Sequence, residues 1–343
     1  MEIGSEFHYI GQEKGKGILL PIGVDDYAYV FSGRTAIETI LNNISIHKVL
    51  LPSYCCDSMI EPFRNAKVEI EFYPVYYDKG LKVELNVFQD SDCILWCNYF
   101  GFSVDFPDIR CFLERGGIVI EDITHSLFSE KNYHDESHYL IASLRKWEPV
   151  LCGGISLSRV NKLKYIPYEQ PEEMFLTKKK AAMELKRRYL EGKNNVSKQE
   201  YLQMFSESNE WLADHYSKLS IDEDSLKYLN HVDYETHRFQ RIKNAEILYR
   251  GLKSHTDIQF LFPIEEMDCP LFVPVIIQNG KRDVIRKKLI DNEIYCPVHW
   301  PKPDIECKSN LYDIELSLIC DHRYNEEDMQ RIVNVLCEIN EGE

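Results

Sequence analysis

Positive charge is scarce in this sequence of 343 residues: 40 Lys and Arg stand against 56 Asp and Glu, which gives a net charge of −16. A chain this acidic repels the phosphates of nucleic acids and anionic membrane surfaces, so neither is expected as a partner. No apolar run approaches the roughly 20 residues that a membrane span needs. The first residues also lack the basic and apolar regions of a secretion signal. We therefore expect a cytoplasmic protein.

Metal-binding and P-loop motifs are missing as well. No Cys-x-x-Cys pair occurs, so no metal site is expected. The eleven cysteines are an odd number, and several lie in apolar runs such as residues 93–97, which indicates reduced thiols in the core and not a disulfide framework. Gly15 and Gly17 do not have the Gly-x-x-x-x-Gly-Lys-Ser/Thr spacing of a P-loop. A nucleotide site of that type is therefore not expected.

Hydrophobic residues make up 44% of the chain, enough for a sizeable core. Residues 1–30 are expected to be loop-like. From residue 31 onward, short apolar runs alternate with segments of helical periodicity. Strands are expected at residues 48–51, 68–73, 93–97, 118–120, 139–143 and 154–157, and helices at residues 36–44 and 57–65. This alternation predicts an α/β fold with a mostly parallel sheet that is covered on both faces.

The second half of the chain changes character. Residues 171–218 are polar and predict two amphipathic helices, with the lysines at 178–180 on a solvated face. A further helix is expected at 237–252, followed by strands at 272–277 and 315–318 and helices at 281–292 and 326–339. We therefore expect a large domain of residues 1–235, which includes the helical segment 171–218, and a small C-terminal α+β domain of residues 236–343.

The first candidate site segment is the loop that enters a helix at Phe31–Ala36. Ser32 and Thr35 are of the residue types that cap helices, and Gly33 permits close approach of the backbone. Exposed amides and the helix dipole make such a turn an anion site, to which Arg34 would add a bidentate phosphate contact. The alternative is an ordinary capped helix.

Three more segments carry polar side chains beside apolar strands. In the first, Asp122 and His125 follow a buried strand, where open α/β sheets bind ligands. In the second, Lys146 follows another strand, where burial and the neighbouring Arg145 would favour a neutral, nucleophilic amine. The third comprises residues 296–301 and 321–324, which would face a cleft between domains. Each also has a plainer interpretation, as turn, core or surface residues.

Taken in order, these segments resemble the DegT/DnrJ/StrS family of pyridoxal-phosphate-dependent sugar aminotransferases, which have the aspartate aminotransferase fold. Ser32–Ala36 is similar to the family's Ser-Gly-Thr-Ala phosphate turn, and Glu121–His125 to its Glu-Asp-x-Ala-His/Gln motif. Ser143–Lys146, followed by two glycines, resembles the segment of the cofactor-bearing lysine. Weaker similarities lie at Leu51–Cys56, Asn98–Gly101 and Leu316–Ile319.

The resemblance implies pyridoxal 5'-phosphate as the cofactor and a role for each matching residue. Lys146 would be the catalytic residue that carries the cofactor, Asp122 would pair with the pyridine nitrogen, and His125 would lie near the ring hydroxyl. Whether Tyr54 or Cys56 stacks on the ring stays open. The implied cofactor-binding residues are Gly33, Arg34, Thr35, Tyr54, Cys56, Asp122, His125 and Ser143, and the implied substrate-binding residues are His299 and Arg323.

The implied activity is transfer of an amino group from an amino acid such as glutamate to a keto sugar carried on a nucleotide, in sugar and polysaccharide biosynthesis. A homodimer is implied, because sites of this fold are built at a dimer interface. Two alternatives remain: another pyridoxal-phosphate enzyme acting on a non-sugar ketone, and a non-catalytic binding or regulatory protein. A dehydratase of this family would have His in place of Lys146.

Overall fold

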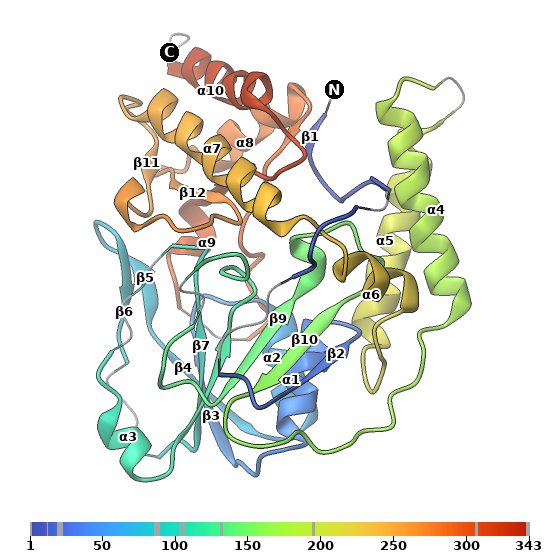
Figure 1. Ribbon diagram of the computed structural model, residues 1–343. Helices are drawn as coiled ribbons and strands as arrows, with labels where there is room; N and C mark the ends of the chain where they lie inside the picture. Colours follow the sequence, from blue (N-terminus) through green and yellow to red (C-terminus); the bar gives the residue numbers. More distant parts are fainter. Residues whose placement is uncertain are drawn as a thin grey trace.

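A seven-stranded sheet forms the centre of the computed structural model (Figure 1). The structure describes residues 2–11, 13–18, 23–85, 90–102, 104, 107–130, 133–193, 196–305 and 308–340. Across the sheet the strands are β2 (Asp26–Val30), β10 (Gly154–Ser158), β9 (Tyr139–Ser143), β8 (Ile118–Asp122), β7 (Cys93–Cys97), β3 (Lys48–Pro52) and β4 (Glu69–Tyr73). The strand β10 runs in the opposite direction to the other six strands, and the neighbouring pairs without β10 are parallel. The predicted mostly parallel sheet is therefore confirmed.

Helices cover both faces of this sheet. Alternate residues of a strand point to opposite faces, and in β9 Ile141 packs in one core cluster while Leu140 and Ala142 pack in another. The first cluster includes α1 (Gly33–Leu41) and α2 (Asp57–Asn65), and the second includes side chains of α4 (Glu173–Leu190), α5 (Lys198–Asp214) and α6 (Glu223–Leu229). The result is a three-layer α/β arrangement.

The helices α4 and α5 pack against each other and stand beside the sheet, at the right of Figure 1. The prediction that lysines 178–180 form a solvated face is wrong for Lys179. Its side chain is buried, and its ammonium lies 3.4 Å from the carboxylate of Glu6 and 3.1 Å from the amide oxygen of Asn209. Helical periodicity explains this, because Lys179 lies on the same face as the buried residues Phe175 and Met183.

A smaller unit lies above the sheet in Figure 1. Its sheet consists of β11 (Gln259–Phe260), β12 (Val273–Ile276) and β14 (Glu315–Leu318), all antiparallel. Its helices are α7 (Tyr234–Leu252), α8 (Arg282–Asp291), α9 (Leu311–Ile314) and α10 (Glu326–Asn340). The short elements elsewhere are α3 (Arg110–Glu114), the hairpin β5 (Val75–Tyr77) and β6 (Leu81–Val83), and the 3-10 helices η1 (Leu144–Lys146) and η2 (Ile264–Glu266).

The N-terminal segment is not entirely loop, as was expected for residues 1–30. β2 is an edge strand of the main sheet, paired antiparallel with β10, and β1 (Ile3–Gly4) pairs with β13 (Ile294–Tyr295). Both strands depend on partners far away in the sequence, which local patterns do not reveal. The predicted division at residues 235 and 236 falls just inside the start of α7, and it stays a prediction.

Seven cysteines are buried among the ten that the structure describes, and all ten are free thiols. This confirms that the described cysteines are mostly core residues. Cys111 is exposed, and Cys307 lies outside the described residues. In the described part of the chain, no helix has both the length and the apolar character that a membrane crossing requires.

Candidate active site

Lys146 lies in η1, directly after the strand β9. The next strand, β10, starts with Gly154, where a Cβ atom would come within 2.2 Å of the carbonyl oxygen of Ser32. The N–H of Gly153 donates to the carbonyl of Phe31 over 2.7 Å. The two glycines therefore let the lysine segment pack directly against the turn that begins α1, and this brings two of the predicted motifs together.

The carboxyl end of β8 presents Asp122, which is buried. One carboxylate oxygen accepts the N–H of Thr124 over 2.8 Å. The hydroxyl of Thr124 accepts the N–H of Ser143, and the backbone carbonyl of Thr124 accepts the indole N–H of Trp147. Burial raises the pKa of Asp122, while the bonds from Thr124 and the charge of Lys146 act in the opposite direction. A cationic ligand group would stabilise this carboxylate.

Glu121, by contrast, points to the other side of the sheet. Its carboxylate is fully buried and accepts hydrogen bonds from Asn98, His134 and Ser137. Because neighbouring strand residues face opposite sides, only Asp122 of this acidic pair belongs to the site.

His125 connects Lys146 to the aromatic wall of the site. Its Nδ1 accepts the N–H of Phe100 over 3.2 Å, and its Nε2 lies 3.3 Å from Nζ of Lys146. Burial, together with the positive charges of Lys146 and His299, holds the pKa of His125 well below its usual value. In a neutral ring whose Nδ1 accepts, the proton is on Nε2. Nε2 of His125 can donate to Nζ of Lys146 only when that amine is neutral, and the ring itself stacks on Trp300 at 5.4 Å.

These side chains surround a cavity that we call the inner cavity. Of the residues predicted from the sequence, the inner cavity is lined by Gly33, Arg34, Cys56, Asp122, His125, Ser143 and Lys146. Its other lining residues include Thr124, Arg145 and Trp300. The amino end of α1, capped by the side chain of Ser32, borders it. Segments separated by more than a hundred residues therefore meet around one small volume.

Two predicted cofactor residues, Thr35 and Tyr54, do not line the inner cavity. The hydroxyl of Thr35 donates to the carbonyl of Tyr216 over 2.8 Å, behind the first turn of α1. The ring of Tyr54 packs among Tyr99, Trp300 and Tyr312. Trp300 thus separates Tyr54 from His125 in the aromatic stack.

Arg34 lines the cavity but is already paired, because its Nε lies 2.6 Å from the carboxylate of Glu61. The bidentate phosphate contact predicted for Arg34 would have to share the guanidinium with this carboxylate. Arg145, the neighbour of Lys146 in the sequence, has no ion-pair partner among the described residues. It lines both the inner cavity and a second one beside it.

We call this second cavity the outer cavity. It measures about 390 Å³, and Lys146, His299 and Arg323 are among its lining residues. His299 is buried, and its Nδ1 lies 2.7 Å from the hydroxyl of Ser317, which donates to Glu315. Arg323 is held by two hydrogen bonds to the carboxylate of Asp321. The two predicted substrate residues therefore do lie in one cavity with Lys146.

Replacing Glu315 with Gln should make the free energy of unfolding less dependent on pH. Burial raises the pKa of Glu315 from 4.5 to about 8. Between these pH values the folded state holds a proton that the unfolded state has lost, so stability falls as the pH rises, by up to about 1.4 kcal/mol per pH unit. In urea unfolding from pH 5 to 8, the free energy of unfolding of Glu315→Gln should increase relative to that of the wild type as the pH rises. A constant difference would contradict the prediction.

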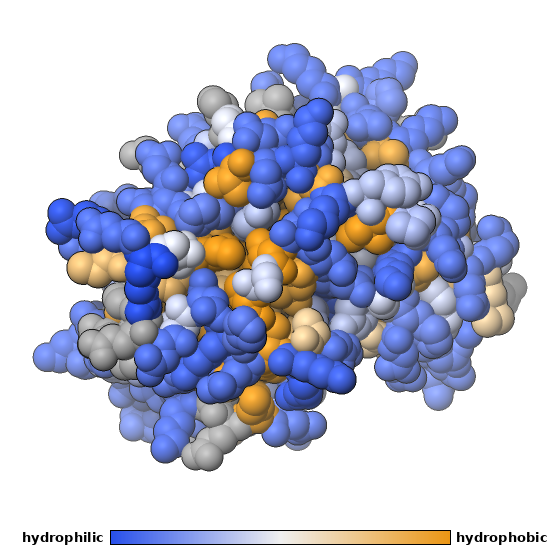
Figure 2. All heavy atoms as spheres, turned by 90° about the horizontal axis from the view of Figure 1, so that it is seen from below, coloured by the Kyte–Doolittle hydropathy of each residue, from blue (hydrophilic) through white to orange (hydrophobic). Residues whose placement is uncertain are grey.

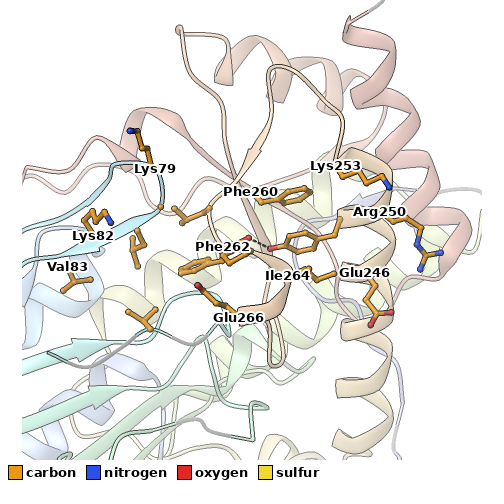
Figure 3. Close-up of a pocket in the computed structure, with 16 residues that line it drawn as sticks. Lys79, Lys82, Val83, Glu246, Arg250, Lys253, Phe260, Phe262, Ile264 and Glu266 are labelled. Atoms are coloured by element: carbon orange, nitrogen blue, oxygen red, sulfur yellow. Dashed lines mark hydrogen bonds between the residues drawn. The ribbon is translucent and has the colours of Figure 1, made fainter.

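A larger cavity lies elsewhere (Figure 3). It measures about 1200 Å³ and lies between the β5–β6 hairpin, which carries Lys79 and Lys82, and the segments that carry Arg250, Lys253 and Phe260. It contains none of the residues predicted to take part in catalysis or binding. The size of a cavity alone therefore does not indicate the reactive centre. The titratable groups around Lys146 do indicate it.

A scan against protein-family models and a search of curated protein sequences found no match. Solved structures do match. A DegT/DnrJ/EryC1/StrS aminotransferase from Brucella abortus has a TM-score of 0.61 at 15% identity, with 94% of this chain and 91% of that chain covered. PseC from Helicobacter pylori, an aminotransferase involved in the biosynthesis of pseudoaminic acid, has a TM-score of 0.67 at 12% identity over 98% and 99%. DesI, crystallised in the presence of its TDP-sugar product, has a TM-score of 0.63 at 11% identity over 92% and 80%.

These similarities show that the chain has the α/β fold of pyridoxal-phosphate-dependent aminotransferases. Within that fold, the similar structure from Brucella abortus is an aminotransferase of the DegT/DnrJ/EryC1/StrS group. This is the group that the sequence motifs resemble, and the fold expected from them is confirmed.

Proposed function

We propose that the protein is a pyridoxal-phosphate-dependent aminotransferase that moves an amino group from an amino acid to a keto sugar carried on a nucleotide. One observation carries the proposal: a lysine, a buried carboxylate and a helix amino terminus surround one cavity, each on a different segment. Packing alone does not require a carboxylate at Asp122, since burial raises its pKa. A cationic ring nitrogen would stabilise it there.

The residues present fit pyridoxal phosphate. The carboxylate of Asp122 would hold the ring nitrogen, and the stacked pair of His125 and Trp300 would line the ring pocket. The amides at the start of α1, with Ser143, would hold the phosphate, because a helix amino terminus favours anions. The bound cofactor supplies an electron sink for cleavage of a bond to the amino carbon.

The chain's own groups would then move protons. Lys146 would hold the cofactor through its nucleophilic amine, and the same amine would act as the general base that moves a proton. His125 directs a hydrogen-bond donor at the lysine nitrogen, 3.3 Å away. Asp122 keeps a positive charge on the ring nitrogen. The aromatic wall formed by Phe100 and Trp300 packs around His125 and helps to exclude water.

A nucleotide-linked keto sugar is proposed as the acceptor because DesI, one of the similar structures, was crystallised with its TDP-sugar product. PseC acts in the biosynthesis of another sugar-like compound, pseudoaminic acid. The outer cavity beside Lys146 provides the polar groups that a sugar needs, with His299 foremost. A role in sugar or polysaccharide biosynthesis follows from this acceptor.

His299→Ala should lower kcat/KM for the acceptor by about 5- to 150-fold, because a hydrogen bond lost in a buried site costs roughly 1–3 kcal/mol. The half-reaction with the amino donor should change much less. The two half-reactions can be followed separately by rapid-mixing absorbance. An equal loss in both would place the effect on the cofactor, and loss of folded protein would make His299 a packing residue.

The visible spectrum of the purified protein tests the proposed function directly. Protein that is incubated with pyridoxal phosphate and then desalted should retain the visible absorption band of bound pyridoxal phosphate. The band should change on addition of a suitable amino acid and return on addition of a keto acceptor. Protein that retains no cofactor would contradict the proposal. Cofactor retention without a response to any amino acid would favour a binding or regulatory protein.

The proposed assembly is a homodimer in the cytoplasm, with residues 1–235 and 236–343 as its two domains. Figure 2 shows hydrophobic side chains gathered in the middle of one face of the molecule, surrounded by hydrophilic ones. An apolar area of this kind is often covered by a partner. Light scattering during size-exclusion chromatography should give twice the mass of the chain, 40.4 kDa. The mass of a single chain would exclude the homodimer.

A further inference from the structure

Arg145 carries a guanidinium that nothing in the described part of the chain pairs with. Its Nε is buried there without a hydrogen-bond partner, and the side chain lines both cavities beside Lys146. Burial lowers the pKa of Arg145, and the negative charge of Glu6 opposes that shift at longer range. Arg145 as a whole is half-buried, and a ligand carboxylate could form a charge-assisted pair with its guanidinium.

Arg241 is a second guanidinium on the outer cavity, and it is fully buried. It donates to the carbonyl oxygens of Leu271 and Trp147 over 3.2 and 3.4 Å, but its Nε has no partner among the described residues. These carbonyls and the ring of Trp147, 4.6 Å from the guanidinium carbon, fix the position of this group, and the carboxylates of Asp321 and Glu148 balance part of its charge. Arg241 is therefore a rigidly placed positive charge on the same cavity as Arg145.

The other charged side chains of the outer cavity are largely balanced. Arg323 is paired with Asp321 in a bidentate arrangement. Glu6 is paired with Lys179, and the charges of Lys179 and Arg145 hold its pKa at about 2 despite burial. Four cationic side chains and two acids line the cavity in all, so an excess of positive charge remains beside Lys146.

We propose that Arg145 and Arg241 bind the side-chain carboxylate of a dicarboxylic amino donor, such as glutamate, in the outer cavity. This rests on the proposed aminotransferase function, in which the donor's amine must reach Lys146. A volume of about 390 Å³ accommodates such an amino acid. Arg145 is then the residue that selects the donor. Its planar guanidinium matches a carboxylate in a way that a neutral side chain cannot.

The test compares glutamate with glutamine, which has the same shape but an uncharged side chain. Arg145→Gln should lower kcat/KM of the donor half-reaction with glutamate by about 10- to 100-fold. This is the effect expected when one charge-assisted pair is lost. The value for glutamine should change by less than about 3-fold. Arg110→Gln, at an arginine that is exposed and outside both cavities, serves as the matched control and should change neither.

Other outcomes would overturn the proposal, each for a distinct reason. An equal loss with both amino acids would mean that Arg145 binds the group they share, the α-carboxylate. Weaker cofactor retention with an unchanged donor preference would place Arg145 on the phosphate in the inner cavity. A defect confined to the half-reaction with the nucleotide sugar would assign it to the diphosphate of the acceptor.

A binding measurement separates this proposal from the proposed function. Titration calorimetry with glutarate and butyrate, which differ by one carboxylate, should show that only glutarate loses affinity in Arg145→Gln, by about 10-fold or more. Arg145→Gln removes one of the two charges that hold the pKa of Glu6 low, so the variant should be somewhat less stable than the wild type but still folded, which its unfolding temperature checks. Unchanged glutarate affinity would refute the carboxylate site, whether or not the protein retains pyridoxal phosphate.

Discussion

Lys146→Ala should abolish covalent attachment of the cofactor and reduce turnover by about 10⁴-fold or more, the scale seen when a covalent nucleophile is removed. The reason is positional: Nζ of Lys146 lies 3.3 Å from Nε2 of His125, and Lys146 lines the inner cavity with Asp122. Borohydride reduction of the wild type, followed by peptide mass mapping, should find the pyridoxyl group on Lys146.

The matched control is Lys162→Ala, at an exposed lysine that lines neither cavity. It should retain both label and turnover. A label on a lysine other than 146, or full turnover in Lys146→Ala, would refute the assignment. Added methylamine, a free amine that can enter the space left by the side chain, should restore part of the activity of Lys146→Ala. It would restore no activity if the variant were misfolded.

Asp122→Asn should retain cofactor while losing turnover by about 10²- to 5 × 10³-fold. Breaking one side of a buried charge pair costs about 3–5 kcal/mol, and each 1.36 kcal/mol is a factor of about ten in rate. Asn keeps the shape of the side chain, and its carbonyl oxygen still accepts the N–H of Thr124, which the carboxylate accepts over 2.8 Å. The fold around Ser143 and Trp147 should therefore survive.

Two measurements distinguish an electronic role of Asp122 from a structural one. The absorption band of the bound cofactor should shift in Asp122→Asn, because the ring nitrogen would lose its charged partner, while the unfolding temperature should change little. Asp122→Glu should recover part of the rate if the negative charge matters. Wild-type turnover in Asp122→Asn with cofactor bound would refute the role.

Local sequence signals were sufficient for most of the sheet and for the centre of the site. Short continuous apolar runs such as Cys93–Cys97 are typical of buried strands, and polar residues at the carboxyl ends of such strands meet at one edge of a parallel sheet. This is why Asp122 and Lys146, 24 positions apart, were predicted to act together. The positions of α1 and α2 followed from helical periodicity in the same way.

What the sequence could not reveal depends on long-range packing. Trp300 lines the inner cavity because it stacks on His125, a contact across 175 positions. That Nε of Arg145 lacks a hydrogen-bond partner among the described residues likewise depends on contacts distant in the sequence. Arg34 carried a phosphate-binding signal, but Glu61 pairs with it from the next helix. Tyr54 is an aromatic residue in the expected segment, yet its ring packs among other aromatics.

The pairing of β1 with β13 sets an order of events during synthesis. Ser5, Glu6 and Phe7, which follow β1, form one wall of the outer cavity, and Asp321 and Arg323 form another. The first wall leaves the ribosome almost three hundred residues before its strand partner exists. The sheet can collapse early on its own strands, whereas the outer cavity must wait until residues 321–323 have been made. A nascent chain would therefore be compact well before this cavity is closed.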